Sequence, residues 1–170
     1  MCSPERTGPL WAAAKRGTRA LSVDIEAKER RLVHRLLIHW RELASEDQLP
    51  SRACVKADEI GDMWRYCFTL DIGAVAGVFA HVGEAHVAHL GFDLTGKPIA
   101  AAQKGTLLGC ALDRLDDVLL RRIPITRQGT FSGDDGVPVP YRSILLPLAD
   151  DGSEINGILG AANCRLPEFM

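Results

Sequence analysis

The sequence predicts an α+β fold, in which a five-stranded antiparallel sheet carries helices on one face and follows an amphipathic N-terminal helix. Two Asp-Asp-Gly segments, at 134–136 and 150–152, separate strand-like runs and are typical of hairpin turns. The hydrophobic period changes from helical to two near residue 64. The resulting order is one helix, two strands, two or more helices and three strands, which is typical of helices packed on an antiparallel sheet.

The first 47 residues divide into a tail and a helix. Residues 1–21 are predicted to form a flexible tail, because prolines and glycines interrupt them. Residues 22–47 predict an amphipathic helix that ends near Glu46, ahead of Leu49-Pro50. Its apolar stripe consists of Ile25, Leu32, Leu36, Trp40 and Leu43. We predict that this stripe forms a homodimer interface; the simpler alternative is that it covers the domain behind it.

The remaining elements follow from periodicity and turn residues. Trp64–Asp71 alternates as a strand does, and Ala74–Ala80 is predicted to return antiparallel to it. Helices are predicted at Lys56–Asp62, Glu84–Leu90 and Thr106–Leu120, and strands at Arg121–Phe131, Val139–Leu148 and Ile155–Cys164. Prolines at 138, 140 and 147 predict bulges or a partly exposed edge. Gly157 and Gly160 in the last strand indicate a bulge, packing against the long helix, or close approach of another backbone or a ligand.

Composition excludes several classes of protein. Twenty basic and twenty-two acidic residues give a net charge of −2, so a general electrostatic interaction with nucleic acid is not expected. No apolar run approaches the roughly 20 residues of a membrane span. The start of the chain lacks an apolar signal core, and the five cysteines are scattered without a C-x-x-C pair. We therefore expect a cytoplasmic protein with reduced thiols.

Catalytic motifs are missing from the sequence. It contains no G-x-S-x-G elbow, no H-E-x-x-H and no complete P-loop, so we expect a protein that is not an enzyme. The acidic residues of 113–117 are interpreted as a solvated face. His81, His86 and His89 form the one suggestive metal or haem cluster, but their spacing matches no structural zinc pattern, and ordinary polar histidines are the favoured interpretation.

Four segments together resemble a bacterial family of short, stand-alone PAS-like proteins. They are L-P-S-R-A at 49–53, G-F-D-L-T-G-K-P-I at 91–99, Y-R-S-I-L-L-P-L at 141–148 and N-G-I-L-G-A at 156–161. The G-x-D-L-T-G and Y-R-x-I-L-L-P-L blocks are the distinctive parts. The resemblance covers roughly residues 40–165 and places a PAS-like domain at 48–166, followed by a tail at 167–170.

The resemblance implies a sensory or regulatory module of bacterial signalling that acts on an unidentified signalling protein. PAS domains often dimerise through a flanking helix and often bind a small molecule between sheet and helices. Candidate residues for that cavity are Phe68, Phe79, Cys110, Tyr141, Ser143 and Asn163. No cofactor transfers, and the photoreactive-cysteine motif of flavin-binding relatives is missing. The alternatives are a ligand-independent scaffold or localisation adaptor and, less favoured, a haem or metal sensor.

Overall fold

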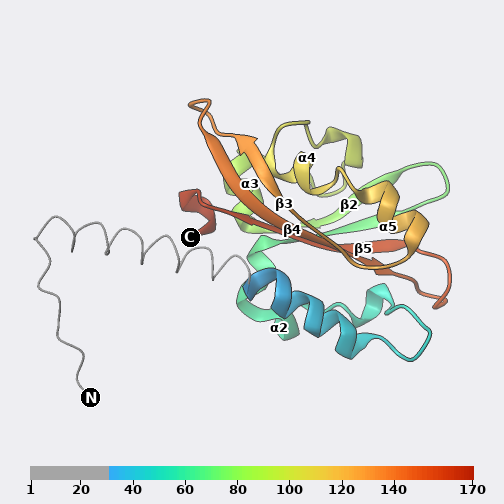
Figure 1. Cartoon of the computed structure of the whole chain (residues 1–170). Coiled ribbons are helices and arrows are strands. Elements are labelled where there is room, and N and C mark those ends of the chain that lie inside the picture. Colours follow the sequence, from blue (N-terminus) through green and yellow to red (C-terminus); the bar gives the residue numbers. More distant parts are fainter. Residues whose placement is uncertain (1–30) are drawn as a thin grey trace, which may run out of the picture.

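The sheet is antiparallel and five-stranded, with the strand order β2-β1-β5-β4-β3. A computed structural model describes residues 31–170; the predicted tail at 1–21 and residues 22–30 of the predicted helix lie outside the described residues. The strands are β1 (Cys67–Ile72), β2 (Gly77–Val82), β3 (Ile125–Ser132), β4 (Pro138–Leu148) and β5 (Gly157–Cys164). The predicted α+β class, a five-stranded antiparallel sheet with helices, is confirmed, but helices lie on both faces of the sheet and not on one (Figure 1).

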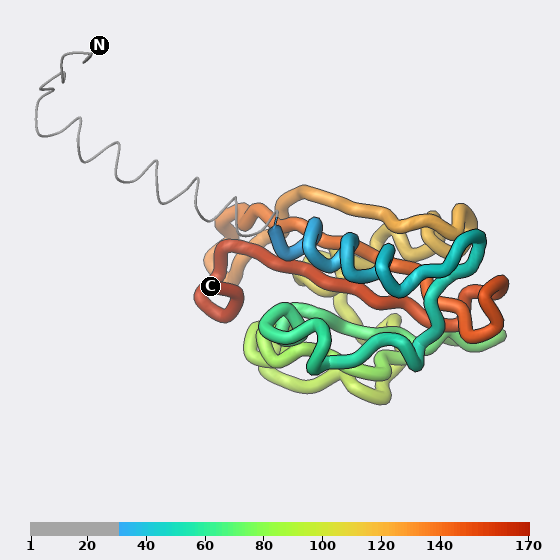
Figure 2. Tube along the Cα trace, turned by 90° about the horizontal axis from the view of Figure 1, so that it is seen from below, coloured from blue at the N-terminus to red at the C-terminus, as the bar shows by residue number. Residues whose placement is uncertain are grey.

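Helical segments cover both faces of the sheet (Figure 1). The segments between β2 and β3 lie on one face, here called the inner face; they are α3 (Glu84–Leu90), η3 (Ile99–Ala101), α4 (Leu107–Ala111) and α5 (Leu115–Arg121). On the opposite, outer face lie a helix at residues 31–43 and the short α2 (Ala57–Ile60). Seen from below, the helix at 31–43 runs along the central strands (Figure 2).

Each face of the sheet has its own apolar core. Side chains alternate along a strand, so neighbouring residues enter different cores. In β5, Ile158 and Ala162 enter the inner core, whereas Leu159 and Ala161 enter the outer core. The sheet is therefore a shared wall between two buried layers, and this explains why all eight residues of β5 are buried.

The predicted Asp-Asp-Gly turns are present. Gly136 and Gly152 have φ values of 78° and 77°, a left-handed conformation that glycine adopts without steric cost. Of the two alternatives predicted for the proline-containing strand, the bulges are wrong, because β4 pairs in continuous register with both neighbours, and the partly exposed edge is present at Pro138 and Pro140. Pro138 and Pro140 lie where β4 extends past β5, so their missing N–H groups cost no bond to that strand. A register shift occurs instead between Thr69 and Leu70 of β1.

Several element boundaries differ from the prediction. The long helix expected at 106–120 is two helices, because the Leu112 amide donates to the carbonyls of Leu108 and Gly109 and tightens the turn that ends α4. The first strand starts at Cys67 rather than Trp64, because residues Gly61–Tyr66 form the 3₁₀ helix η2. The N-terminal helix ends at residue 43, and Asp47 follows in a left-handed turn with φ 64°.

The segment expected to be a C-terminal tail is packed. It forms η4 (Pro167–Phe169), and Phe169 is only 3% exposed. The Phe169 ring lies 5.2 Å from the His86 ring and 6.2 Å from the Tyr66 ring, centroid to centroid. Burial of this aromatic ring explains why the segment folds back. Within residues 31–170, no helix is both long and apolar enough to cross a bilayer.

Candidate functional site

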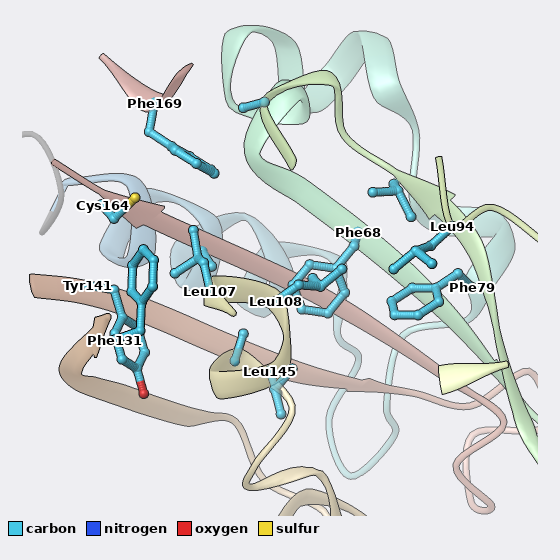
Figure 3. Close-up of a cluster of buried hydrophobic side chains, with 14 of the residues drawn as sticks. Phe68, Phe79, Leu94, Leu107, Leu108, Phe131, Tyr141, Leu145, Cys164 and Phe169 are labelled. Atoms are coloured by element: carbon cyan, nitrogen blue, oxygen red, sulfur yellow. The ribbon is translucent and has the colours of Figure 1, made fainter. Parts of the chain in front are cut away.

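The space between the inner face and α3–α5 is occupied by the chain's own side chains (Figure 3). Phe68 and Phe79, two of the predicted cavity residues, are fully buried there. They belong to one cluster with Leu107 and Leu108 of α4 and with Leu145 of β4. Protein interiors pack at near-crystalline density, so a ligand at this position would have to displace these side chains.

Gly160 of β5 is needed for this packing. A Cβ atom at position 160 would collide with the Phe68 ring, which lies directly over the glycine. The sequence indicated a bulge, the long helix, another backbone or a ligand at Gly160, but β5 pairs in continuous register and an aromatic side chain of β1 lies there instead. A residue larger than glycine at position 160 would exclude the Phe68 ring from this place on the sheet.

Cys110 and Tyr141, two further predicted cavity residues, lie at the rim of the inner core beside β3. Arg127 of β3 donates to the Asp113 carboxylate at 3.0 Å. Burial raises the pKa of the Cys110 thiol, and the nearby Asp113 charge raises that pKa further. Burial also raises the pKa of the Tyr141 phenol, although Arg127 opposes this shift. At neutral pH both groups are therefore protonated donors beside an ion pair.

The last two predicted cavity residues lie on different faces. Ser143 is buried and pairs with Ala162, on the inner side of the sheet. Asn163 belongs to the outer side, where it lines a groove with Leu32 and Met63. Its Oδ1 accepts a hydrogen bond from the Cys164 amide at 2.9 Å. The prediction that Asn163 lines the same cavity as Phe68 is therefore wrong, because odd-numbered residues of β5 point away from that cavity.

The three histidines make different contacts, although His86 and His89 share the Phe169 ring. His81 stacks on Trp64 at 4.2 Å, and His89 contacts the Phe131 and Phe169 rings edge-on. His86 Nε2 donates to the Tyr66 carbonyl at 2.8 Å, and burial lowers the pKa of His86 to about 4. Across residues 31–170, no group of three or more His, Cys, Asp or Glu side chains is placed to hold a metal ion.

The predicted dimer stripe packs against the chain's own sheet. Leu32, Leu36 and Trp40 are buried in the outer core, and the Trp40 indole N–H donates to the Pro147 carbonyl at 2.9 Å. The prediction that these three residues face a second copy is wrong, because the outer face of the sheet already covers them. Leu43 is half-buried at the end of the helix, and Ile25 lies outside the described residues.

A sequence model of the PAS domain matches residues 29–163. That match spans most of the 170 residues and includes β1 to β4 and all of β5 except Cys164. This chain belongs to the PAS domain family. No curated protein matches the chain.

Solved structures similar to this PAS domain include light-oxygen-voltage (LOV) domains. The dark structure of the blue-light photoreceptor Aureochrome1 LOV has 13% identity and a TM-score of 0.48, covering 71% of this chain and 88% of that one. The Rhodobacter sphaeroides LOV protein has 12% identity and a TM-score of 0.45, covering 59% of each chain. The LOV domain of a blue-light activated histidine kinase from Erythrobacter litoralis has 16% identity and a TM-score of 0.44, covering 58% and 94%.

One polar cluster of this PAS domain was not predicted. Arg52 donates to Asp150 at 2.7 Å and to Asp71 at 2.9 Å, and thereby ties the segment after the N-terminal helix to strand β1 and to the turn after β4. The hydrogen bonds from Arg52 lower the pKa of Asp150 to about 2. Gly157 lies beneath this side chain, where a Cβ atom would come within 2.6 Å of Arg52 Cγ. The only sequence signal was the position of Arg52 in the L-P-S-R-A block.

Proposed function

We propose that this PAS domain is a non-catalytic regulatory module of bacterial signalling that acts through contacts with other proteins in the cytoplasm. The observation that carries the proposal is the filled inner core, in which Phe68, Phe79 and Leu108 occupy the space beneath the helices. Because its interior is filled by its own side chains, such a module would contact its partners through its surface. We infer that specificity resides there.

The chemistry of the polar rim supports a role without catalysis. The Cys110 thiol is kept protonated by burial and by Asp113, and a thiol is a far weaker nucleophile than a thiolate. The Asp113 carboxylate is paired with Arg127, and so is not a free base. Cys67 is buried in the outer core, and burial raises its pKa to about 12.

Small-molecule sensing is the second candidate function, and one observation favours it. Tyr141, Cys110 and Arg127 place hydrogen-bond donors at the rim of the inner core, beside β3. A ligand with acceptor groups could bind these donors if the α4 side chains Leu107 and Leu108 moved aside. Under this alternative the filled core is the unliganded state.

We also propose that the chain forms a homodimer, but through a surface other than the predicted apolar stripe. Because Leu32, Leu36 and Trp40 are covered within the chain, a homodimer would use the opposite side of the helix at 31–43. Ile38 lies there with 40% of its surface exposed. We infer a homodimer contact through Ile38.

Native mass spectrometry tests this function on protein isolated gently from the cells that make it. We expect the mass of the chain, or of chain assemblies with protein, with no small molecule attached. A compound of defined mass that leaves only on denaturation would contradict the proposal and establish the sensing alternative. Ile38→Glu is expected to convert a dimer to a monomer, with Arg41→Glu as an exposed control on the same helix.

A further inference from the structure

The two edge strands of the sheet, β2 and β3, differ in whether another segment covers them. The β2 edge is covered, because Phe79 N donates to the Lys97 carbonyl at 2.9 Å and Gly96 N donates to the Phe79 carbonyl at 2.7 Å. The opposite edge is β3, which pairs only with β4. In the part of the chain from residue 31 onward, no backbone bond reaches β3 from any other segment.

The β3 strand lacks the features that protect exposed edges. It pairs in continuous register over eight residues, with no bulge and no proline, and its single charge, Arg127, is held by Asp113. Edge strands that must stay unpaired usually carry such interruptions, because a row of free N–H and C=O groups templates another strand. The β3 edge is therefore suited to accept an additional strand.

A groove runs beside this edge on the outer face. Val33 and Leu37 of the helix at 31–43 form one side, and Thr126 and Gln128 of β3 form the other. Its floor includes Arg142 of β4, which pairs in register with Gln128. A strand added to β3 would direct alternate side chains into this groove, where they would meet two apolar side chains and one guanidinium.

The positive charge of the groove favours an acidic ligand. Its lining contains His34, Arg142 and Arg127, whose charge is paired with Asp113, and no carboxylate, although the whole chain has a net charge of −2. Arg142 is half-buried and makes no ion pair with any described residue. A half-buried guanidinium without an acidic partner favours a carboxylate ligand, and charge-assisted bonds of this kind are stronger than neutral ones.

We propose that the open edge of β3 binds an extended, acidic segment of a partner protein as a sixth strand. The segment's carboxylates contact Arg142, and its apolar side chains fill the groove beside Val33 and Leu37. This inference deepens the proposed function, because it names the surface through which the module contacts its partner.

The test uses the full chain and a fluorescein-labelled octapeptide of alternating Glu and Val. Fluorescence anisotropy at low salt is expected to show saturable binding with a Kd below about 1 mM. Arg142→Glu should weaken binding at least tenfold, whereas Arg41→Glu, which makes the same charge change outside the groove, should leave it within twofold. A probe with Lys in place of Glu should not bind.

Two further measurements test the geometry. The same peptide N-methylated at every residue has no N–H group to donate to β3, so it should not bind; equal binding would overturn strand addition. Hydrogen exchange should show new protection in Ile125–Ser132 and none in Gly77–Val82 when the probe is added. If the β3 amides that do not pair with β4 were protected in the full chain alone, residues 1–30 or a second copy would already cover this edge, and the proposal would be overturned.

The outcomes separate this inference from the proposed function. If the acidic probe fails to saturate below about 1 mM while native mass spectrometry still finds a protein assembly, the assignment of β3 is wrong and the regulatory function stands. If the native protein carries a small molecule, the proposed function is wrong, whatever the probe does.

Discussion

Replacement of Leu36 by alanine tests whether the N-terminal helix belongs to the fold. Leu36 is fully buried against the outer face of the sheet, in a cluster with Ile144, Leu146 and Leu159. The substitution removes three carbon atoms, worth about 2.4 kcal/mol at ~0.8 kcal/mol for each buried methylene. The residual cavity adds to this, and leucine-to-alanine changes in cores cost about 2–5 kcal/mol. We expect a loss of about 3 kcal/mol in the free energy of unfolding.

Urea unfolding followed by circular dichroism measures this loss, with Arg41→Ala as the matched control. Arg41 is on the same helix but exposed, so its replacement should change the free energy of unfolding by less than about 1 kcal/mol. For a domain of this size, 3 kcal/mol corresponds to a fall in Tm of about 6–12 °C. If both variants unfolded at the same urea concentration as the wild type, the helix would not be packed on the sheet and the reasoning would be refuted.

Three further predictions concern buried groups. Gly160→Ala should lower the free energy of unfolding by about 1–3 kcal/mol, because its Cβ would collide with Phe68; a variant as stable as the wild type would contradict the packing. The unfolded-state pKa of a histidine is near 6.5 and that of folded His86 is about 4, so the unfolded chain binds an extra proton between these values. The free energy of unfolding should therefore fall by on the order of 3 kcal/mol as pH drops from 6.5 to 4, and by less in His86→Gln. If the free energy of unfolding changed equally with pH in the two proteins, His86 would not be the group that binds the extra proton. Iodoacetamide should label half-buried Cys54 well before Cys67, as mass spectrometry of the folded protein would show.

The order of elements could be predicted because it depends on local signals. Residues that alternate in polarity became β1, and glycines that follow aspartate pairs became the turns at Gly136 and Gly152. Periodicity also identified the apolar stripe of the N-terminal helix. It could not identify what covers that stripe, because a second copy and the chain's own sheet bury the same residues.

The candidate site was harder to predict, because it depends on register and on contacts distant in the sequence. Asn163 was assigned to the inner cavity, but its face follows from how β5 pairs with β4, and a shift of one residue reverses every side chain. The ion pair of Arg52 and Asp150 joins residues 98 positions apart, which no local pattern reveals. Phe169 lies in a segment too short for any periodicity to show that it folds back onto α3.

Hydrogen exchange on the module in its native assembly tests the central claim most directly. The chain would be isolated with its bound protein, and its exchange compared with that of the free chain, element by element. If the module acts through its surface, protection should appear along β3 and the helix at 31–43, while α4 and α5 exchange unchanged. Protection confined to α4, α5 and the inner sides of β1 and β5 would mean that the interior receives the signal, and would contradict the account.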